Sequence, residues 1–232
     1  MTFNSYSSFG EDAILNGIIK RLEWLNDCKL ENLTYVDLGC YEPIDHSNTF
    51  FLYDKGWTGT LVDANPALID KITTLRPKDI FLNVLVSTDN NEKDFFIFSD
   101  EGASNTASKE FAEKISLSQG VEVSKTVKVK SMTIDEIVKK HIDNFKQDPF
   151  FIDIDIEGHD LEILESYSWK VRIPIIMIEE NVGEQYFNSK IKTILLDNGY
   201  IPIASTILST IYIDETSDIF KSIKKIGNKN YE

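Results

Sequence analysis

The sequence is poor in cysteine, in basic residues and in long apolar runs. It has only two cysteines among 232 residues, so we expect no disulfide framework and a reducing compartment, the cytoplasm. The segment 1–10 is polar and lacks the apolar core of a signal peptide, so no secretion signal is predicted. The longest apolar runs, such as 173–178, are far shorter than the roughly 20 residues that cross a bilayer. No membrane span is therefore predicted.

Basic residues are outnumbered by acidic ones. The chain has 24 lysines and arginines against 38 aspartates and glutamates, which gives a formal net charge of −14 at pH 7. A surface of this charge repels phosphate backbones and anionic lipid headgroups, so neither nucleic acid nor an acidic membrane is expected as a partner. With 42% hydrophobic residues the chain can bury a sizeable core, and its length favours a single domain over residues 1–232.

Apolar stretches alternate with helical patterns along most of the chain. Strands are predicted at 35–38, 60–62, 80–86, 150–156 and 173–178, and helices at 10–26, 47–55, 133–141, around 161–164 and at 187–198. Segments 200–204 and 207–213 are predicted to form a terminal hairpin. This order predicts an α/β fold with a mostly parallel sheet, helices on both faces and one antiparallel hairpin. Ligands bind such a sheet beyond the carboxyl ends of its strands.

The region 87–131 interrupts this alternation. Polar turns surround a short aromatic run and a later alternating segment, which together predict a strand, a long loop and a returning strand. The loop over 99–119 has the glycine, serine and asparagine content of a mobile lid. Because it follows the third strand, we expect it to lie over the ligand edge of the sheet. A plain disordered loop is the alternative.

Acidic and small residues stand directly at the ends of the predicted strands. Asp37 and Gly39 end the first strand, and Asp63 ends the second, 26 residues after Asp37. This spacing fits a carboxylate that holds the ribose hydroxyls of a nucleotide lying over the turn at Gly39. A single glycine makes no pyrophosphate cradle, and carboxylates suit a cationic ligand better than phosphates. The pattern therefore points to S-adenosylmethionine, whose sulfonium and α-amino groups are positive.

A further row of acids follows residue 150. Asp153, Asp155 and Glu157 alternate along a predicted strand, so they would share one face of it. Three acids on a buried face need ionic partners, a metal or water, and a solvated edge strand is the alternative. They could hold the cofactor's amine, remove the acceptor's proton, or bind a divalent metal such as Mg or Mn. The metal ligands would be Asp153, Asp155 and Glu179, which ends the next predicted strand.

His159 stands at a predicted strand-to-helix junction, four residues after Asp155. Histidine exchanges a proton near neutral pH and suits a general base, although a structural histidine at a helix start is an equal alternative. Methyl transfer from a sulfonium needs mainly in-line positioning and a base for the acceptor's hydroxyl proton. We expect Asp155, His159 or Glu179 to be that base.

A series of short segments along the chain belongs together. The segments are YSSFGED (6–12), YVDLGC (35–40) with Pro43, SNT (47–49), LY (52–53), GWTG (56–59), VDANP (62–66), RPKD (76–79) and FIDIDIEGHD (151–160) followed by IE (178–179). Together they resemble the FkbM family of S-adenosylmethionine-dependent methyltransferases. They run in the family's order from about residue 6 to 180, roughly three quarters of the chain, and their joint occurrence is more specific than any one of them.

The resemblance implies a Rossmann-like methyltransferase fold and an enzyme that moves a methyl group to an oxygen. The acceptor would be a hydroxyl of a sugar, a glycan precursor or a small phosphorylated metabolite, as in polysaccharide modification. Asp37 and Gly39 would line the methionine end of the cofactor, Asp63 its ribose and Ser87 its adenine. The expected cofactor contacts are Glu11, Asp37, Gly39, Ser47, Asn48, Asp63, Ala64, Asn65 and Ser87.

Two positions depart from the family pattern. Ser8 stands where the family usually has glutamine at an N-terminal cofactor contact, and Asp153 adds a carboxylate where a neutral or basic residue is common. Two other functions remain open at this point. One is a nicotinamide-dependent oxidoreductase on a similar sheet, which the single glycine argues against. The other is a non-catalytic member of the fold that binds a partner protein.

Overall fold

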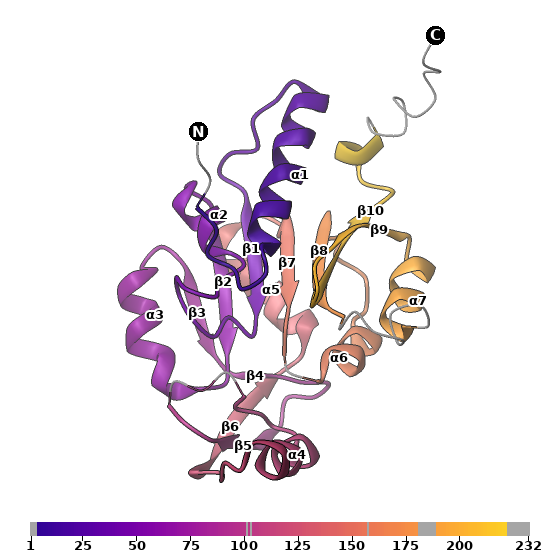
Figure 1. Ribbon diagram of the computed structural model, residues 1–232. Coiled ribbons are helices and arrows are strands. Elements are labelled where there is room, and N and C mark those ends of the chain that lie inside the picture. Colours follow the sequence, from indigo (N-terminus) through magenta and orange to yellow (C-terminus); the bar gives the residue numbers. More distant parts are fainter. Residues whose placement is uncertain (1–3, 101, 103, 157, 181–188, 222–232) are drawn as a thin grey trace.

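A seven-stranded sheet forms the centre of the computed structural model (Figure 1). The structure describes residues 4–100, 102, 104–156, 158–180 and 189–221. The strands of this sheet are β1 (Thr34–Leu38), β2 (Thr58–Asp63), β3 (Ile80–Asn83), β7 (Phe151–Ile154), β8 (Ile175–Glu179), β9 (Tyr200–Ser205) and β10 (Ser209–Asp214). Strands β1, β2, β3, β7 and β8 are parallel, whereas β10 is antiparallel to both β8 and β9. The predicted parallel sheet with a C-terminal antiparallel hairpin is confirmed.

The strand order reverses beside β1. Across the sheet the order is β3-β2-β1-β7-β8-β10-β9, so the chain first moves outward from β1 and later returns to β7 on the other side of β1. Where the order reverses in this way, the connections after the two neighbouring strands leave in opposite directions. They open a crevice at the carboxyl ends of the strands, and ligands bind there in open α/β sheets.

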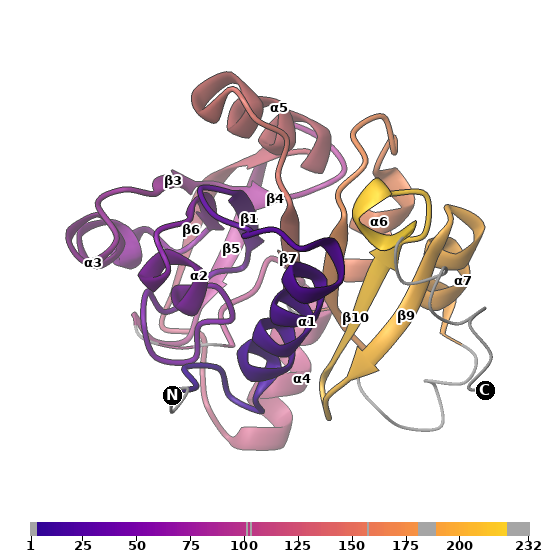
Figure 2. The same ribbon diagram turned by 90° about the horizontal axis from the view of Figure 1, so that it is seen from above.

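Helices cover both faces of the sheet (Figure 2). Side chains alternate along β1, so Tyr35 packs on one face and Val36 on the other. The first face carries α1 (Glu11–Asn26), α2 (Phe50–Asp54), the short 3-10 helix η1 (Pro66–Leu68) and α3 (Ile69–Leu75). The second carries α5 (Ile134–Phe145), α6 (Asp160–Ser166) and α7 (Lys190–Asp197). No helix in the described part of the chain is both long and apolar enough to cross a membrane.

A second, three-stranded sheet lies beyond the carboxyl ends of the main strands (Figure 1). It has the order β4-β6-β5, with β4 (Leu85–Val86), β6 (Lys125–Met132) and β5 (Glu92–Ile97). The predicted strand over 80–86 is therefore two strands that belong to different sheets. Phe95 and Ile97 of β5 form a small apolar cluster with Val129 and with Ala64 from the end of β2. This cluster fixes the second sheet against the edge where the ligand site is expected.

The predicted loop over 99–119 is wrong in its second half. Residues Lys109–Gln119 form helix α4, which begins where the Ser108 side chain accepts a hydrogen bond from the backbone of Phe111 and ends at Gly120 with φ of 68°. Ala112 and Ile115 are the buried residues of this otherwise polar helix. A helix with so narrow an apolar side resembles a polar loop in the sequence. Helix α3 was not among the predicted elements either, although the rest of the predicted order is present.

Candidate functional site

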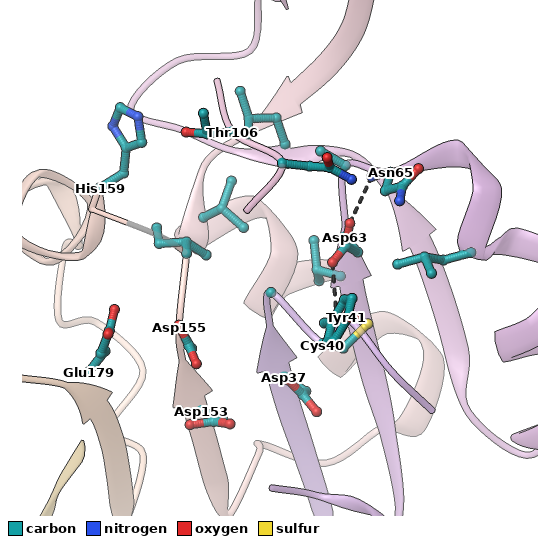
Figure 3. Close-up of a pocket in the computed structure, with 18 of the residues that line it drawn as sticks. Asp37, Cys40, Tyr41, Asp63, Asn65, Thr106, Asp153, Asp155, His159 and Glu179 are labelled. Atoms are coloured by element: carbon teal, nitrogen blue, oxygen red, sulfur yellow. Dashed lines mark hydrogen bonds between the residues drawn. The ribbon is translucent and has the colours of Figure 1, made fainter. Parts of the chain in front are cut away.

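A cavity of about 370 Å³ opens at the carboxyl ends of β1, β2, β7 and β8 (Figure 3). This volume lies within the usual range for small-molecule sites. It lies where the strand order reverses, and the second sheet forms its far wall. Eleven of the predicted site residues line it: Asp37, Gly39, Ser47, Asn48, Asp63, Ala64, Asn65, Asp153, Asp155, His159 and Glu179. None of the described residues that line it is a lysine or an arginine.

Gly39 allows the close approach of two backbone segments at the floor of the cavity. Its φ is +86°, and its amide donates to the carbonyl of Val62 at 2.8 Å. A Cβ atom at this position would lie 1.8 Å from the carbonyl oxygen of Asp155, which follows β7. Only glycine combines this left-handed backbone with this contact. The single glycine after the first strand therefore shapes the floor of the cavity.

The loop after Gly39 lines the cavity and contains two further residues with a left-handed backbone conformation. Tyr41 has φ of 41° and His46 has φ of 61°, and both line the cavity. Residues other than glycine adopt this conformation at an energetic cost, and such residues gather at functional sites. The amide of Tyr41 donates to Oδ2 of Asp63 at 3.1 Å, which joins this loop to the end of β2.

The carboxylate of Asp63 is held by two backbone amides. Besides Tyr41, the amide of Asn65 donates to Oδ1 at 2.7 Å. The Asn65 side chain in turn accepts from the amide of Ala67 at 3.0 Å and donates to the carbonyl of Asp100 at 2.9 Å. Burial raises the pKa of Asp63 to about 6, against the two amide hydrogen bonds, which lower it. A carboxylate fixed in this way can accept hydrogen bonds from a pair of ligand hydroxyls.

Asp37 and Asp153 are direct cross-strand neighbours. They are register partners in the β1–β7 pair, so both side chains leave the same face of the sheet. Asp37 accepts a hydrogen bond from the Thr49 hydroxyl at 2.5 Å, and Asp153 accepts one from the Asn48 amide at 2.9 Å. Burial raises the pKa of Asp37 to about 6, although the charge of Arg76 and the Thr49 hydroxyl lower it.

Burial, followed by the charges of Asp37 and Asp155, raises the pKa of Asp153 well above its ordinary value. Two buried carboxyls side by side cannot both ionise without a cation, so this pair is suited to an ammonium group. The prediction that Asp153, Asp155 and Glu157 share one face of a strand is not confirmed, because only Asp153 lies on the strand. Strand β7 ends at Ile154, Asp155 lies in the loop after it, and Glu157 is outside the described residues.

The three predicted base candidates lie in different parts of the cavity. Figure 3 shows Asp155 and Glu179 at the ends of β7 and β8, in the same part of the view as Asp153, whereas His159 is drawn apart from them. The His159 ring has Nδ1 3.4 Å from a carboxylate oxygen of Glu162. Its Nε2 is buried and has no hydrogen-bond partner among the described residues.

The prediction of a divalent metal on Asp153, Asp155 and Glu179 has no support in the structure. Within the described ranges, no group of three histidine, cysteine, aspartate or glutamate side chains is arranged to hold a metal ion. Asp153 is part of β7 and faces the Asn48 amide, whereas Asp155 belongs to the loop after that strand.

Two predicted cofactor contacts, Glu11 and Ser87, lie outside the lining of the cavity. Buried Glu11 accepts from the Thr206 hydroxyl at 2.7 Å and from the amide of Phe9 at 2.9 Å. It therefore joins the start of α1 to the turn between β9 and β10. The amide of Ser87 donates to the carbonyl of Met132 at 3.0 Å, which continues the pairing of β4 with β6. The residues just before Ser87, 84–86, line the cavity instead.

An apolar wall was missed by the sequence reasoning. It is formed by Leu68, Val84, Leu85, Val86 and Phe95, and the polar residues Asn105 and Thr106 continue it. Val84 directly follows β3, so inspection of the strand ends could have found it. Phe95 comes from the second sheet, and no local pattern shows that it reaches this edge. Burial raises the pKa of Cys40, so the thiol stays protonated and acts as a small wall residue.

The family model for the methyltransferase FkbM domain matches residues 37–202. The match contains every strand of the main sheet except β10 and part of β1 and β9, together with all the lining acids. This chain belongs to the FkbM family of S-adenosylmethionine-dependent methyltransferases. This family membership argues against the alternative that the protein is a nicotinamide-dependent oxidoreductase. A search of curated protein sequences found no significant match.

Three solved structures are similar in their overall trace. A TehB-like SAM-dependent methyltransferase from Corynebacterium glutamicum has 10% identity and a TM-score of 0.44, with 89% of this chain and 88% of that chain covered. The Burkholderia thailandensis 1,6-didemethyltoxoflavin-N1-methyltransferase, bound to its substrate and S-adenosylhomocysteine, has 9% identity, a TM-score of 0.45 and coverages of 88% and 76%. The Methanococcus jannaschii fibrillarin pre-rRNA processing protein has 12% identity, a TM-score of 0.41 and coverages of 81% and 69%.

Proposed function

We propose that this protein is an S-adenosylmethionine-dependent O-methyltransferase whose acceptor is a hydroxyl of a sugar or glycan precursor. The observation that carries the proposal is the pair of carboxylates, Asp37 and Asp63, on either side of the floor made by Gly39 in a family methyltransferase pocket. When bound, the cofactor supplies a methyl group already activated by the sulfonium. The protein has to hold the acceptor in line and remove its proton.

The chemistry of the lining fits the parts of this cofactor. The acids Asp37 and Asp153 suit the α-amino group, with Gly39, Ser47 and Asn48 beside the methionine end. Asp63, with Ala64 and Asn65 beside it, suits the ribose hydroxyls. The apolar wall of Leu68, Phe95 and residues 84–86 suits the flat adenine ring. We assign Ser87 no adenine contact, because its neighbours line the cavity in its place.

The acceptor's charge follows from the same lining. A phosphate near the reacting hydroxyl would need a basic side chain or a bridging metal. The described lining contains no lysine or arginine, and the described residues contain no cluster of side chains arranged to hold a metal ion. Of the three acceptor classes, the sugar and the glycan precursor therefore have support, and the small phosphorylated metabolite has none.

The base would be one of Asp155, His159 and Glu179, which all line the cavity. The test uses three single variants, Asp155→Asn, His159→Gln and Glu179→Gln. Each keeps the side chain polar and removes its ability to take a proton. The true base should lower kcat by about 10²- to 10⁴-fold and leave the affinity for S-adenosylhomocysteine nearly unchanged. If all three variants keep wild-type kcat, general base catalysis by these residues is excluded.

Calorimetric titration with S-adenosylhomocysteine tests the cofactor assignment. We expect saturable one-to-one binding by the wild type and loss of measurable binding in Asp63→Asn. Asp143→Asn, an exposed acid on α5, is the matched control and should bind like the wild type. Absence of binding by the wild type at high micromolar ligand would contradict the proposal. Binding without methyl transfer to any hydroxylated acceptor would favour the non-catalytic, partner-binding reading.

We also propose that residues 1–232 form one catalytic domain that works in the cytoplasm. The compartment is inferred from the low cysteine content, and both cysteines are free thiols, one exposed and one buried. The net charge of −14 supports the absence of a nucleic-acid partner. A polyanion such as heparin should therefore not retain the protein at low salt.

A further inference from the structure

A fully buried arginine lies behind the cofactor-facing acids. Arg76 directly follows α3, has no exposed surface and is not part of the cavity lining. Its Nε donates to Asp79 at 2.7 Å and its Nη2 to the Tyr35 hydroxyl at 2.5 Å. The guanidinium also lies 5.3 Å from the ring centre of Tyr53. A charge is kept this deep only where it has an ionic partner and filled hydrogen bonds.

Asp79 is fixed on its other side as well. Its Oδ2 accepts from the Tyr35 hydroxyl at 2.7 Å, and its Oδ1 accepts from the amide of Gly59 at 2.6 Å. A Cβ atom at position 59 would lie 2.2 Å from the Tyr35 ring, so that position is held to glycine. Segments 56–59 and 76–79, which both belong to the family resemblance, are therefore joined in one hydrogen-bonded network. That network locks the plane of the Arg76 guanidinium.

The remaining arm of Arg76 points toward the cavity. Its Nη1 donates to the Thr49 hydroxyl oxygen at 3.0 Å and to the Ser47 hydroxyl oxygen at 3.3 Å. A threonine hydroxyl has one proton, and an arginine N–H can only donate. Because Arg76 fills an acceptor position of Thr49, the single Thr49 proton is left for Oδ2 of Asp37, 2.5 Å away. The Ser47 hydroxyl oxygen, at 3.5 Å, is a more distant acceptor, so the Thr49 proton is directed to the carboxylate.

We infer that Arg76 and Thr49 are positioning residues that hold the Asp37 carboxylate oriented and ionised for the cofactor's α-amino group. The inference rests on the proposed function only in the identity of that ligand group. Arg76 neither lines the cavity nor bonds Asp37 directly, so it acts on Asp37 through its nearby charge and through the Thr49 hydroxyl. Thr49 is itself fully buried, so its hydroxyl, rather than a water molecule, supplies the hydrogen bond to Asp37.

The groups around Asp37 make this hydrogen bond important. The titratable or charged side chains that face it are Arg76, Asp79, Asp153, Asp63 and Cys40. Only one of the five is a cation, and its charge is shared with Asp79 at 2.7 Å. Without a fixed donor at Oδ2, the ionised form of Asp37 would lose one of the few groups that favour it.

Two variants of Thr49 separate positioning from packing. Thr49→Val removes the hydroxyl and keeps the volume, whereas Thr49→Ser keeps the hydroxyl and removes a methyl group. We expect Thr49→Val to weaken S-adenosylhomocysteine binding about tenfold at pH 7 in calorimetry, and the loss to shrink as the pH is raised above 8. Thr49→Ser should bind within about threefold of the wild type at every pH, since it keeps the hydrogen bond.

A second readout does not require the cofactor. Carboxyl ¹³C NMR titration of the ligand-free protein, with Asp37 assigned by its loss in Asp37→Asn, should show a higher pKa for Asp37 in Thr49→Val than in Thr49→Ser. Thermal melting checks that both variants fold. If Thr49→Val is unfolded, the comparison is made with Arg76→Lys, which keeps the charge but cannot donate to Thr49, Tyr35 and Asp79 together.

The outcomes distinguish the inference from the proposed function. Wild-type binding together with identical pH profiles in Thr49→Val and the wild type would overturn the inference alone. Equal losses in Thr49→Val and Thr49→Ser would do the same, because they would indicate packing. An unchanged Asp37 pKa in Thr49→Val would also overturn it. Failure of the wild type to bind, with the NMR shift present, would contradict the proposed function and leave the positioning network standing.

Discussion

Single residues at the floor of the cavity set its shape and its charge. Gly39 places two backbones in contact, and Asp37 and Asp63 stand on either side of it with pKa values raised to about 6. Both features could be read from the sequence in part. The strand ends gave Asp37, Gly39 and Asp63, whereas the contact of Gly39 with the loop after β7 depends on a strand more than a hundred residues later.

Replacement of Gly39 by alanine tests this contact. The added methyl would overlap the Asp155 carbonyl, so we expect Gly39→Ala to lower the free energy of unfolding by about 4 kcal/mol. Gly56→Ala is the matched control, because Gly56 has φ of +91° but open space around its Cβ position. It should cost only about 1 kcal/mol. Urea unfolding measures both, and equal losses would show that backbone strain alone restricts position 39.

The two raised acids predict how cofactor binding depends on pH. Asp37 and Asp63 ionise as the pH rises through about 6, and only the ionised forms attract an ammonium group and accept from both ribose hydroxyls. The affinity for S-adenosylhomocysteine should therefore fall by about tenfold or more between pH 7 and pH 5. Calorimetry in overlapping buffers gives the profile. A constant affinity across this range would exclude a role for their ionisation.

At the scale of elements, the sequence predicts well what is local. Alternation and capping patterns predicted most helices and strands, and the order of elements predicted the parallel sheet. Helix α4 was missed because only Ala112 and Ile115 are buried in it. Phe95 was missed because its place in the cavity wall depends on the pairing of β5 with β6 and on the packing of that second sheet. The hydrogen bond between Glu11 and Thr206 could not be predicted from a local pattern, because the two residues are 195 positions apart.

Helix α5 is joined to the sheet by a buried histidine. His141 has no exposed surface, and its two ring nitrogens bond the hydroxyls of Thr60 at 3.0 Å and Thr34 at 2.9 Å. Burial lowers the pKa of His141 to about 4. Between pH 6.5 and 4 the unfolded chain takes up a proton that the folded chain does not. The contribution of His141 to stability is therefore present above pH 6.5 and lost as the pH falls toward 4.

The variant His141→Gln isolates this effect. Asp37 and Asp63 change stability in the opposite direction, because their raised pKa values favour the folded state as the pH falls from 6 to 4. They are common to both proteins, so they cancel in a comparison. We expect the difference in unfolding free energy between wild type and variant to shrink by about 3 kcal/mol between pH 7.5 and 4. A difference that stays constant in urea titrations would show that His141 does not resist protonation.

At the scale of the whole molecule, the excess negative charge has a definite location. Among the described residues, five acidic side chains line one cavity where the strand order reverses, and none of the lining residues is a lysine or an arginine. By itself, the net charge of −14 argues only against polyanionic partners. The fold gathers part of it at the methyltransferase edge, where a cationic cofactor and a neutral, hydroxylated acceptor are the ligands that this charge favours.

A crystal structure with S-adenosylhomocysteine bound tests the central claim most directly. The account predicts the ribose hydroxyls within hydrogen-bond distance of Asp63, the α-amino group beside Asp37 and the adenine against Phe95 and residues 84–86. The sulfur should then face the part of the cavity lined by Asp155 and Glu179, which leaves that part for the acceptor. Binding of the ligand elsewhere, or in this cavity with its ribose away from Asp63, would contradict the account.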